Sequence, residues 1–231
     1  MKALILAAGS GTRLGAASEG RPKGLVEVGG MAILQRQIAN LRAGGVERTC
    51  IVTGYEFAQL EQRFGDRVDY RFNPFFDRSN NMVSLLFARD WIDDDVIVLY
   101  ADLLYGPDIL DAALTSRGDI SLLVDKTAVE PGHALVSLRD GAVRAIGREL
   151  SPDAADARFI GVAKFSRSGL AEFLPELEGA AKAGRIDQYY TVGLARLAAR
   201  GYRIEAVDVA GRRWREIDTP EDLERARQEW G

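Results

Sequence analysis

The sequence of 231 residues contains only one cysteine and one histidine. The single cysteine, Cys50, excludes an internal disulfide and a cysteine-rich zinc site. Its apolar neighbours at 49–52 favour a buried structural thiol. The single histidine, His133, follows a Pro-Gly pair, and we interpret it as a turn residue. Because there is only one cysteine and one histidine, a Ser-His-Asp or Cys-His catalytic centre is not expected.

Strong net charge and long apolar runs are absent as well. The formal charge is −4 at pH 7, and because nucleic acids are bound by basic surfaces, no nucleic-acid partner is expected. No segment reaches the roughly 18 apolar residues of a membrane span. The apolar run at 3–8 is too short for a signal peptide. We therefore expect a cytoplasmic protein without a membrane partner.

The remaining composition is that of an ordinary globular domain. Hydrophobic residues make up 47% and charged residues 28% of the chain. The length suits a single domain that spans 1–231, and a homodimer is compatible with the sequence.

Apolar runs and helical spacings alternate through the first half. We expect strands at 3–8, 49–52, 68–72, 96–100 and 120–124, and helices at 31–43, 57–64, 81–91 and 107–115. Such alternation predicts a Rossmann-like α/β fold, in which helices flank a mixed, mostly parallel sheet.

The second half has a different pattern. Asp140 and Gly141 form a strong turn signal between expected strands at 134–138 and 142–146, which predicts a small antiparallel insertion. Further strands are expected at 159–165 and 204–209, and helices at 169–183 and 189–199. Thr219 followed by Pro220 is a helix-start signal and predicts a final helix.

A glycine loop directly follows the first expected strand. Residues 7–13 read Ala-Ala-Gly-Ser-Gly-Thr-Arg, and such small residues let backbone N–H groups approach phosphates closely. The loop is neither the dinucleotide fingerprint, whose third glycine is replaced by Leu14, nor a Walker loop. Arg13, Arg21 and Lys23 add the positive charge that a triphosphate needs. The loop alone also fits a tight surface turn with solvated basic residues.

Two aspartates are candidate metal ligands. Asp102 follows the strand expected at 96–100, at the sheet edge where ligands gather. Asp218 stands just before the expected final helix. Mg²⁺ prefers one or two carboxylates together with phosphate oxygens. A strand-end turn for Asp102 and a helix cap for Asp218 remain equally open.

These motifs together resemble the nucleotide-sugar pyrophosphorylase-like nucleotidyltransferases. Residues 6–14 read Leu-Ala-Ala-Gly-Ser-Gly-Thr-Arg-Leu and are followed by Pro22-Lys23, which matches the family pattern L-A-A-G-x-G-T-R-L and P-K. The resemblance implies a fold of the nucleotide-diphospho-sugar transferase type. It implies that Arg13 and Lys23 are catalytic and stabilise the triphosphate. The nucleotide-binding residues of the loop would be Leu6, Ala8, Gly9, Gly11 and Thr12.

The same resemblance covers the two aspartates. Residues 100–102 (Tyr-Ala-Asp) and 216–223 look like the two metal-binding stretches of the family. Asp102 and Asp218 are therefore expected to hold Mg²⁺.

Three further stretches are more similar to the small cytidylyltransferase branch than to the sugar-1-phosphate enzymes. They are 80–85 (Asn-Asn-Met-Val-Ser-Leu), 124–126 (Val-Asp-Lys) and 159–166. This branch activates phosphocholine, 2-aminoethylphosphonate and related compounds with CTP. The resemblance implies that Asn80, Asn81 and Ser84 lie near the base and that Lys126 faces the phosphoryl groups. A helix cap for the asparagines and a solvated strand end for Lys126 are the alternatives.

The acceptor pocket is expected in the second half of the chain. Its candidate residues are Asp187, Tyr189, Tyr190, Trp214 and Glu216. Aromatic and acidic side chains together can hold an amino or trimethylammonium group, although simple packing explains the aromatics equally well. The segment 127–129 lacks the tryptophan of some relatives, which argues against a choline cage and favours an aminophosphonate or another small phosphonate.

The sequence thus predicts a Mg²⁺-dependent cytidylyltransferase with CTP and a small anionic phosphonate or phosphate as ligands. Residues 1–126 form the nucleotide-binding half, and 127–231 form the acceptor-binding half. A sugar-1-phosphate or inositol-phosphate nucleotidyltransferase is the alternative enzyme. A nucleotide-binding regulatory module without catalysis is the alternative from another class.

Overall fold

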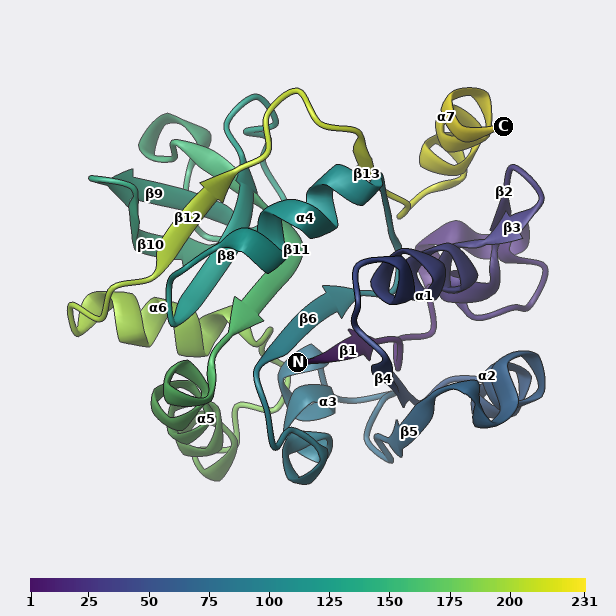
Figure 1. The fold of residues 1–231 in the computed structure, drawn as a ribbon, viewed down its shortest axis with the longest axis horizontal. Coiled ribbons are helices and arrows are strands. Elements are labelled where there is room, and N and C mark those ends of the chain that lie inside the picture. The colour runs from purple at the N-terminus through teal and green to yellow at the C-terminus, as the bar shows by residue number, and fades with distance from the viewer.

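The computed structural model describes residues 1–231 and contains one large mixed sheet. Its strands are β1 (Lys2–Leu6), β4 (Arg48–Thr53), β5 (Asp69–Phe72), β6 (Val96–Tyr100), β8 (Ile120–Asp125), β9 (Leu135–Arg139), β10 (Ala142–Gly147), β11 (Ala157–Phe165) and β12 (Glu205–Asp208). They are ordered β5-β4-β1-β6-β11-β8-β12-β10-β9 (Figure 1). Strands from both halves of the chain therefore share one nine-stranded sheet.

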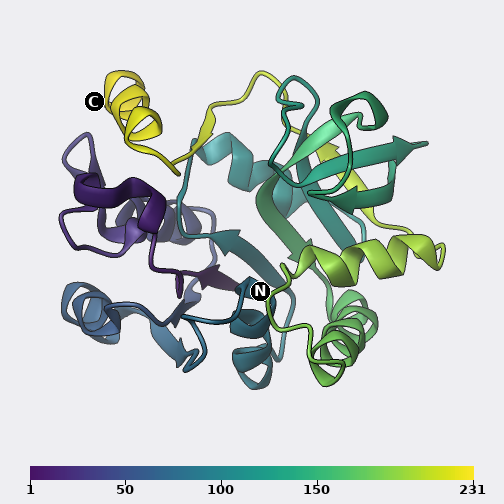
Figure 2. The same ribbon diagram turned by 180° about the vertical axis from the view of Figure 1, so that it is seen from behind.

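Helices cover both faces of this sheet. One face carries α1 (Ile33–Ala43), α2 (Phe57–Phe64) and α4 (Pro107–Thr115), and the other carries α3 (Asn81–Phe87), α5 (Arg167–Lys182) and α6 (Thr191–Ala199). Figure 1 shows α1 and α4 in front of the sheet, whereas Figure 2 shows α6 from the opposite side. Side chains alternate between the two faces of a strand, so Ala3 and Ile5 of β1 enter one core and Leu4 and Leu6 the other.

Parallel pairing aligns the strand ends that lead into the glycine loop. Leu6, at the end of β1, pairs with Val52 of β4 and with Tyr100 of β6. The loops after β1 and β6 consequently leave the sheet at one edge, where ligands of open α/β sheets bind.

The predicted mixed α/β fold is confirmed, but the antiparallel part is larger than the sequence predicts. The β11 strand runs antiparallel to both β6 and β8, and β9 and β10 extend the same sheet. β11 also contains a bulge between Phe159 and Ala163, centred on Gly161 with φ +90°. A side chain at Gly161 would lie 2.6 Å from the Tyr100 ring, so only glycine allows this approach.

Most elements were predicted within two residues, with one clear shortening. The helix expected at 81–91 ends at Phe87, and a 3₁₀ turn at Arg89–Trp91 follows it. Cys50 is buried, as predicted, and burial raises the pKa of its thiol to about 12. No helix combines the length and the apolar character needed to cross a bilayer.

Two short pairings outside the main sheet were not predicted. The β2 strand (Glu27–Val28) pairs with β3 (Met31–Ala32), and β7 (Leu103–Tyr105) pairs antiparallel with β13 (Trp214–Glu216). The final helix, α7 (Pro220–Trp230), lies beside β2 although the two are far apart in sequence (Figure 1). A small apolar cluster fixes this contact and contains Leu14, Val28, Ile217 and Leu223.

Candidate active site

A cavity of about 420 Å³ opens at the edge where β1 and β6 end. Its wall combines the glycine loop, the start of α3 and residues from β11 and the segments beside it. Four arginine and lysine side chains line it against two carboxylates. A cavity of this size and charge suits a small, highly anionic ligand.

The glycine loop forms one side of the cavity. All the loop residues predicted to bind nucleotide line it, namely Leu6, Ala8, Gly9, Gly11 and Thr12. The loop is anchored because Ala8 accepts a hydrogen bond from the backbone N–H of Tyr55 at 3.0 Å. Gly11 has φ +62°, and a Cβ there would lie 2.7 Å from Cγ of Lys23. Glycine at this position therefore both permits the turn and leaves room for the lysine stem.

The predicted catalytic cations and metal carboxylates meet in one cluster. Lys23 Nζ lies 3.0 Å from Asp102 Oδ2 and also bonds Asp218. Arg13 Nη1 lies 2.9 Å from the other oxygen of Asp218. Burial raises the pKa of Asp102 to about 6, although the charge of Lys23 opposes this rise. The two positive and two negative side chains thus pair with one another.

The β7–β13 pairing explains how two aspartates so distant in sequence converge. Asp102 stands directly before β7, and Asp218 stands two residues after the end of β13. The backbone N–H of Ile217 donates to the carbonyl of Asp102 at 2.9 Å, which locks the two segments together. Thr219 caps α7 in a capping box with Asp222. Because Thr219 performs the capping, the Asp218 carboxylate is available to the cluster.

Asp102, Asp218 and Glu216 form a candidate metal centre. One carboxylate oxygen from each lies within 4.8 Å of the others. Asp102 Oδ1 is buried and has no hydrogen-bond partner. A buried, unpartnered carboxylate oxygen is costly unless a cation meets it. The donor set fits Mg²⁺, which is a hard cation that takes oxygen ligands.

Glu216 is held by two basic residues that the sequence analysis did not assign to the site. Arg158 bonds one of its oxygens, and His133 Nδ1 lies 3.5 Å from the same oxygen. Burial by itself would raise the pKa of Glu216, yet His133 and Arg158 lower it to about 2. His133 lies in a turn, as predicted, but it also lines the cavity.

Asn80, Asn81 and Ser84 all line the cavity. Asn80 is also the cap of α3, because its side chain accepts from the backbone N–H of Asn81 at 2.8 Å. The Asn81 side chain accepts from the backbone of Tyr190 at 2.8 Å. Asn80 is therefore both the helix cap and part of the cavity wall.

Several predicted residues are not brought to the cavity. Lys126 lies outside it and pairs with Asp208 at 3.2 Å, and Asp187 is exposed. Trp214 points its indole N–H at Asp125 at 2.8 Å. Tyr190 is fully buried and does not line the cavity, so the structure does not support the predicted contact of its side chain with an acceptor. Its ring packs against Tyr100, Phe159 and Phe173 instead.

Tyr189 and Glu216 are the predicted acceptor residues that do line the cavity. The wall around them contains basic residues that sequence reasoning missed, Arg148 and Arg158. Arg158 could have been noticed, because it is one of two charged residues in a mostly apolar strand. No sequence feature pointed to Arg148, because it follows a strand in an ordinary polar loop.

Comparisons with known proteins agree with this geometry. Residues 3–185 match the family model of the MobA-like NTP transferase domain. The chain is 28% identical to the CMP-5'-(3-aminopropyl)phosphonate synthase of Streptomyces rubellomurinus, with 98% of this chain and 38% of that protein aligned. It is 27% identical to the CTP:phosphoglutamine cytidylyltransferase of Campylobacter jejuni, with 97% and 98% aligned.

The chain spans half or less of the length of the first curated relatives it matches. Among solved structures, the CTP:phosphocholine cytidylyltransferase from Streptococcus pneumoniae superimposes with a TM-score of 0.80. That match covers 100% of this chain and 99% of the other at 22% identity, so it establishes the fold.

Proposed function

The chain belongs to the family of MobA-like NTP transferase domains, and on this premise we propose that it transfers CMP from CTP to a small phosphonate or phosphate acceptor. The predicted resemblance to the cytidylyltransferase branch is confirmed by relatives that are 28% and 27% identical to the chain. Acceptors of this class include 2-aminoethylphosphonate, other phosphonates and phosphocholine. The names of the relatives, with a phosphonate in one and phosphoglutamine in another, support this range.

One observation carries the proposal. Two cations, Arg13 and Lys23, and two carboxylates, Asp102 and Asp218, converge beside the glycine loop. A module that only binds a nucleotide has little use for both carboxylates at the phosphate end. Transfer chemistry needs them, because negative charge accumulates on the leaving pyrophosphate.

The reaction requires mainly positioning and charge. An oxygen of the acceptor attacks the α-phosphorus of CTP, and the bond from that phosphorus to the bridging oxygen breaks. The electron pair leaves with pyrophosphate. A phosphonate oxygen is already anionic at neutral pH, so no general base is required, in agreement with the single histidine of the chain. Mg²⁺ held by Asp102 and Asp218 would supply further charge neutralisation at the phosphates.

The remaining residues divide between the base and the phosphates. We assign Asn80, Asn81 and Ser84 to the base side, because they lie together in the cavity wall. Arg13 and Lys23 exchange their carboxylate partners for phosphate oxygens when CTP binds. The phosphoryl contact predicted for Lys126 stays a prediction, since its amine is engaged by Asp208 in this structure.

Pyrophosphate release measured with each of four NTPs tests this function. Each NTP is combined with Mg²⁺ and with phosphonates, phosphocholine, inositol phosphate or sugar phosphates, and a reaction without enzyme is the control. We expect release with CTP and a small phosphonate or phosphate. Release only with a sugar phosphate or inositol phosphate would favour the alternative enzymes. No release from any pair would favour the regulatory module.

A further inference from the structure

The acceptor side of the cavity contains an arginine that no carboxylate neutralises. Arg148 follows β10 and lines the cavity. Its guanidinium donates to the hydroxyl of Tyr189 at 2.9 Å and to the carbonyl of Gly132. It also stands 4.9 Å from the centre of the Tyr189 ring. These neutral partners orient the guanidinium, which is exposed and has no carboxylate partner.

The other cationic side chains of the cavity are engaged in ion pairs with carboxylates. Arg13 and Lys23 pair with Asp218, and Arg158 pairs with Glu216. Arg148 is in no such ion pair. An arginine that is held in place by neutral groups and faces a cavity is suited to bind a carboxylate or a phosphate through two parallel hydrogen bonds.

The groups predicted to bind a positively charged end are not free beside Arg148. Glu216 is occupied by Arg158 and His133. Asp187 is exposed outside the cavity, and Tyr190 is buried in the core. An ammonium group placed near Arg148 would meet a like charge instead of an aromatic cage.

Arg148 is connected to the reacting end of the cavity through the chain itself. It bonds the carbonyl of Gly132, and the next residue, His133, contacts Glu216 of the carboxylate cluster. An acceptor whose phosphonate lies at this cluster can therefore extend along the wall toward Arg148.

We propose that Arg148, held by Tyr189, binds a second anionic group of the acceptor. The acceptor class is then a small phosphonate or phosphate that carries a carboxylate or another phosphate at its far end. This inference rests on the proposed function, and it narrows the acceptor from the amino compounds that the sequence favoured to doubly anionic ones.

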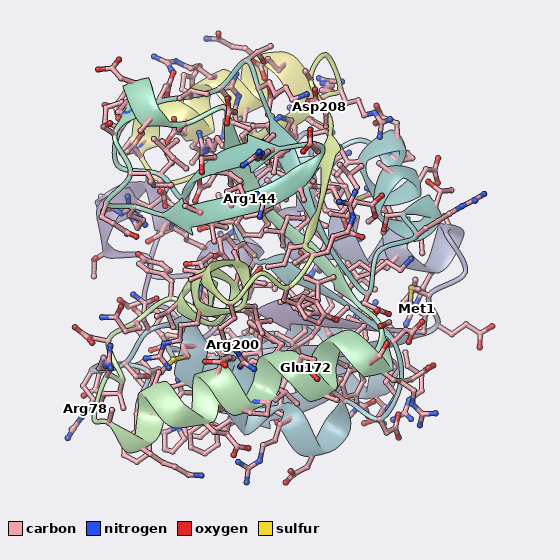
Figure 3. All side chains as sticks on the ribbon, turned by 90° about the vertical axis from the view of Figure 1, so that its left-hand side faces the viewer. Met1, Arg78, Arg144, Glu172, Arg200 and Asp208 are labelled. Atoms are coloured by element: carbon pink, nitrogen blue, oxygen red, sulfur yellow. The ribbon has the colours of Figure 1, made fainter.

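Three phosphonates of matched length test the proposal. They are 2-carboxyethylphosphonate, 3-hydroxypropylphosphonate and 3-aminopropylphosphonate, whose far ends are anionic, neutral and cationic. The kcat/KM of each with CTP is measured for the wild type, for Arg148→Gln and for Arg148→Lys. The control is Arg144→Gln, because Arg144 is an exposed arginine of β10, the strand that ends just before Arg148, and it does not line the cavity. Figure 3 labels its position.

The wild type is expected to prefer the carboxylate over the amine. Arg148→Gln should lower kcat/KM for the carboxylate about tenfold to a hundredfold, the range of one charge-assisted hydrogen-bonding site. The same substitution should change kcat/KM for the neutral acceptor by less than about threefold, because that acceptor has no second anionic group for Arg148 to bind. Arg148→Lys should retain part of the preference, and Arg144→Gln should retain all of it.

Two outcomes overturn the proposal. One is a wild-type preference for the amine. The other is an equal loss for all three acceptors in Arg148→Gln, which would mean that Arg148 binds the reacting phosphonate or the triphosphate. Calorimetry with 2-carboxyethylphosphonate and a non-hydrolysable CTP analogue distinguishes failure of the Arg148 subsite from failure of the proposed function. Binding that depends on Arg148 without turnover supports the subsite alone, and binding that is unaffected by Arg148→Gln refutes it.

Discussion

Replacing Gly11 with alanine should damage catalysis much more than stability. Gly11 has φ +62°, and alanine in this left-handed region costs about 1–2 kcal/mol. The added Cβ would also lie 2.7 Å from Cγ of Lys23, which is closer than real carbon atoms approach. The lysine stem must then move, and its contact with Asp102 at 3.0 Å is lost.

The size of the effect follows from that displaced charge. Removing one preorganised electrostatic contact costs about 3 kcal/mol, or roughly a hundredfold in kcat. The folded state should lose only the backbone strain, which lowers Tm by about 2–8 °C for a domain of this size. Pyrophosphate release and a thermal melt on the same preparation measure the two effects.

Gly30→Ala is the matched control for this experiment. Gly30 has φ +70°, but a Cβ there would meet nothing within 4 Å. It carries similar backbone strain without any clash with Lys23. We expect a comparable drop in Tm and nearly normal kcat. If Gly11→Ala retains wild-type kcat, or if Gly30→Ala loses as much activity, the proposed role of the lysine position is refuted.

Three further substitutions address the same cluster. Asp102→Asn should abolish pyrophosphate release, and turnover retained at saturating Mg²⁺ would remove Asp102 from the metal site. Lys23→Gln should raise the activation barrier by about 3 kcal/mol and so lower kcat roughly a hundredfold, because it removes a charge aimed at the transferring phosphates. An unchanged kcat would exclude that role. Thr219→Ala should cost about 1 kcal/mol of folding stability through the lost cap, seen as a Tm drop of about 2–4 °C. An unaltered Tm would show that the capping box contributes little.

Local patterns predicted most of the secondary structure. The helix expected at 57–64 is α2, and the helix expected at 107–115 is α4. The hairpin at Asp140 and Gly141 is β9 and β10. Apolar periodicity and turn residues act over a few neighbours, so these elements could be read from the chain directly. The three-residue strands β7 and β13 were missed because each is stabilised mainly by its partner.

The acceptor residues were the least predictable part for a related reason. Tyr189 and Tyr190 are adjacent, yet Tyr189 lines the cavity and Tyr190 is in the core. No local pattern distinguishes two neighbouring tyrosines at the start of a helix. The packing of Tyr190 against Tyr100 and Phe159 determines which of the two tyrosines is buried, and both partners lie far away in sequence.

The sequence by itself determined the chemistry that the glycine loop can offer. Small residues after a buried strand, followed by Arg13 and Lys23, provide exposed amides and positive charge wherever the chain folds. Only the tertiary structure decided what these groups would face. Lys23 meets Asp218, 195 positions away, because β7 pairs with β13 and α7 packs near the loop. Such long-range pairing depends on the summed packing of both halves, and no short segment of the sequence encodes it.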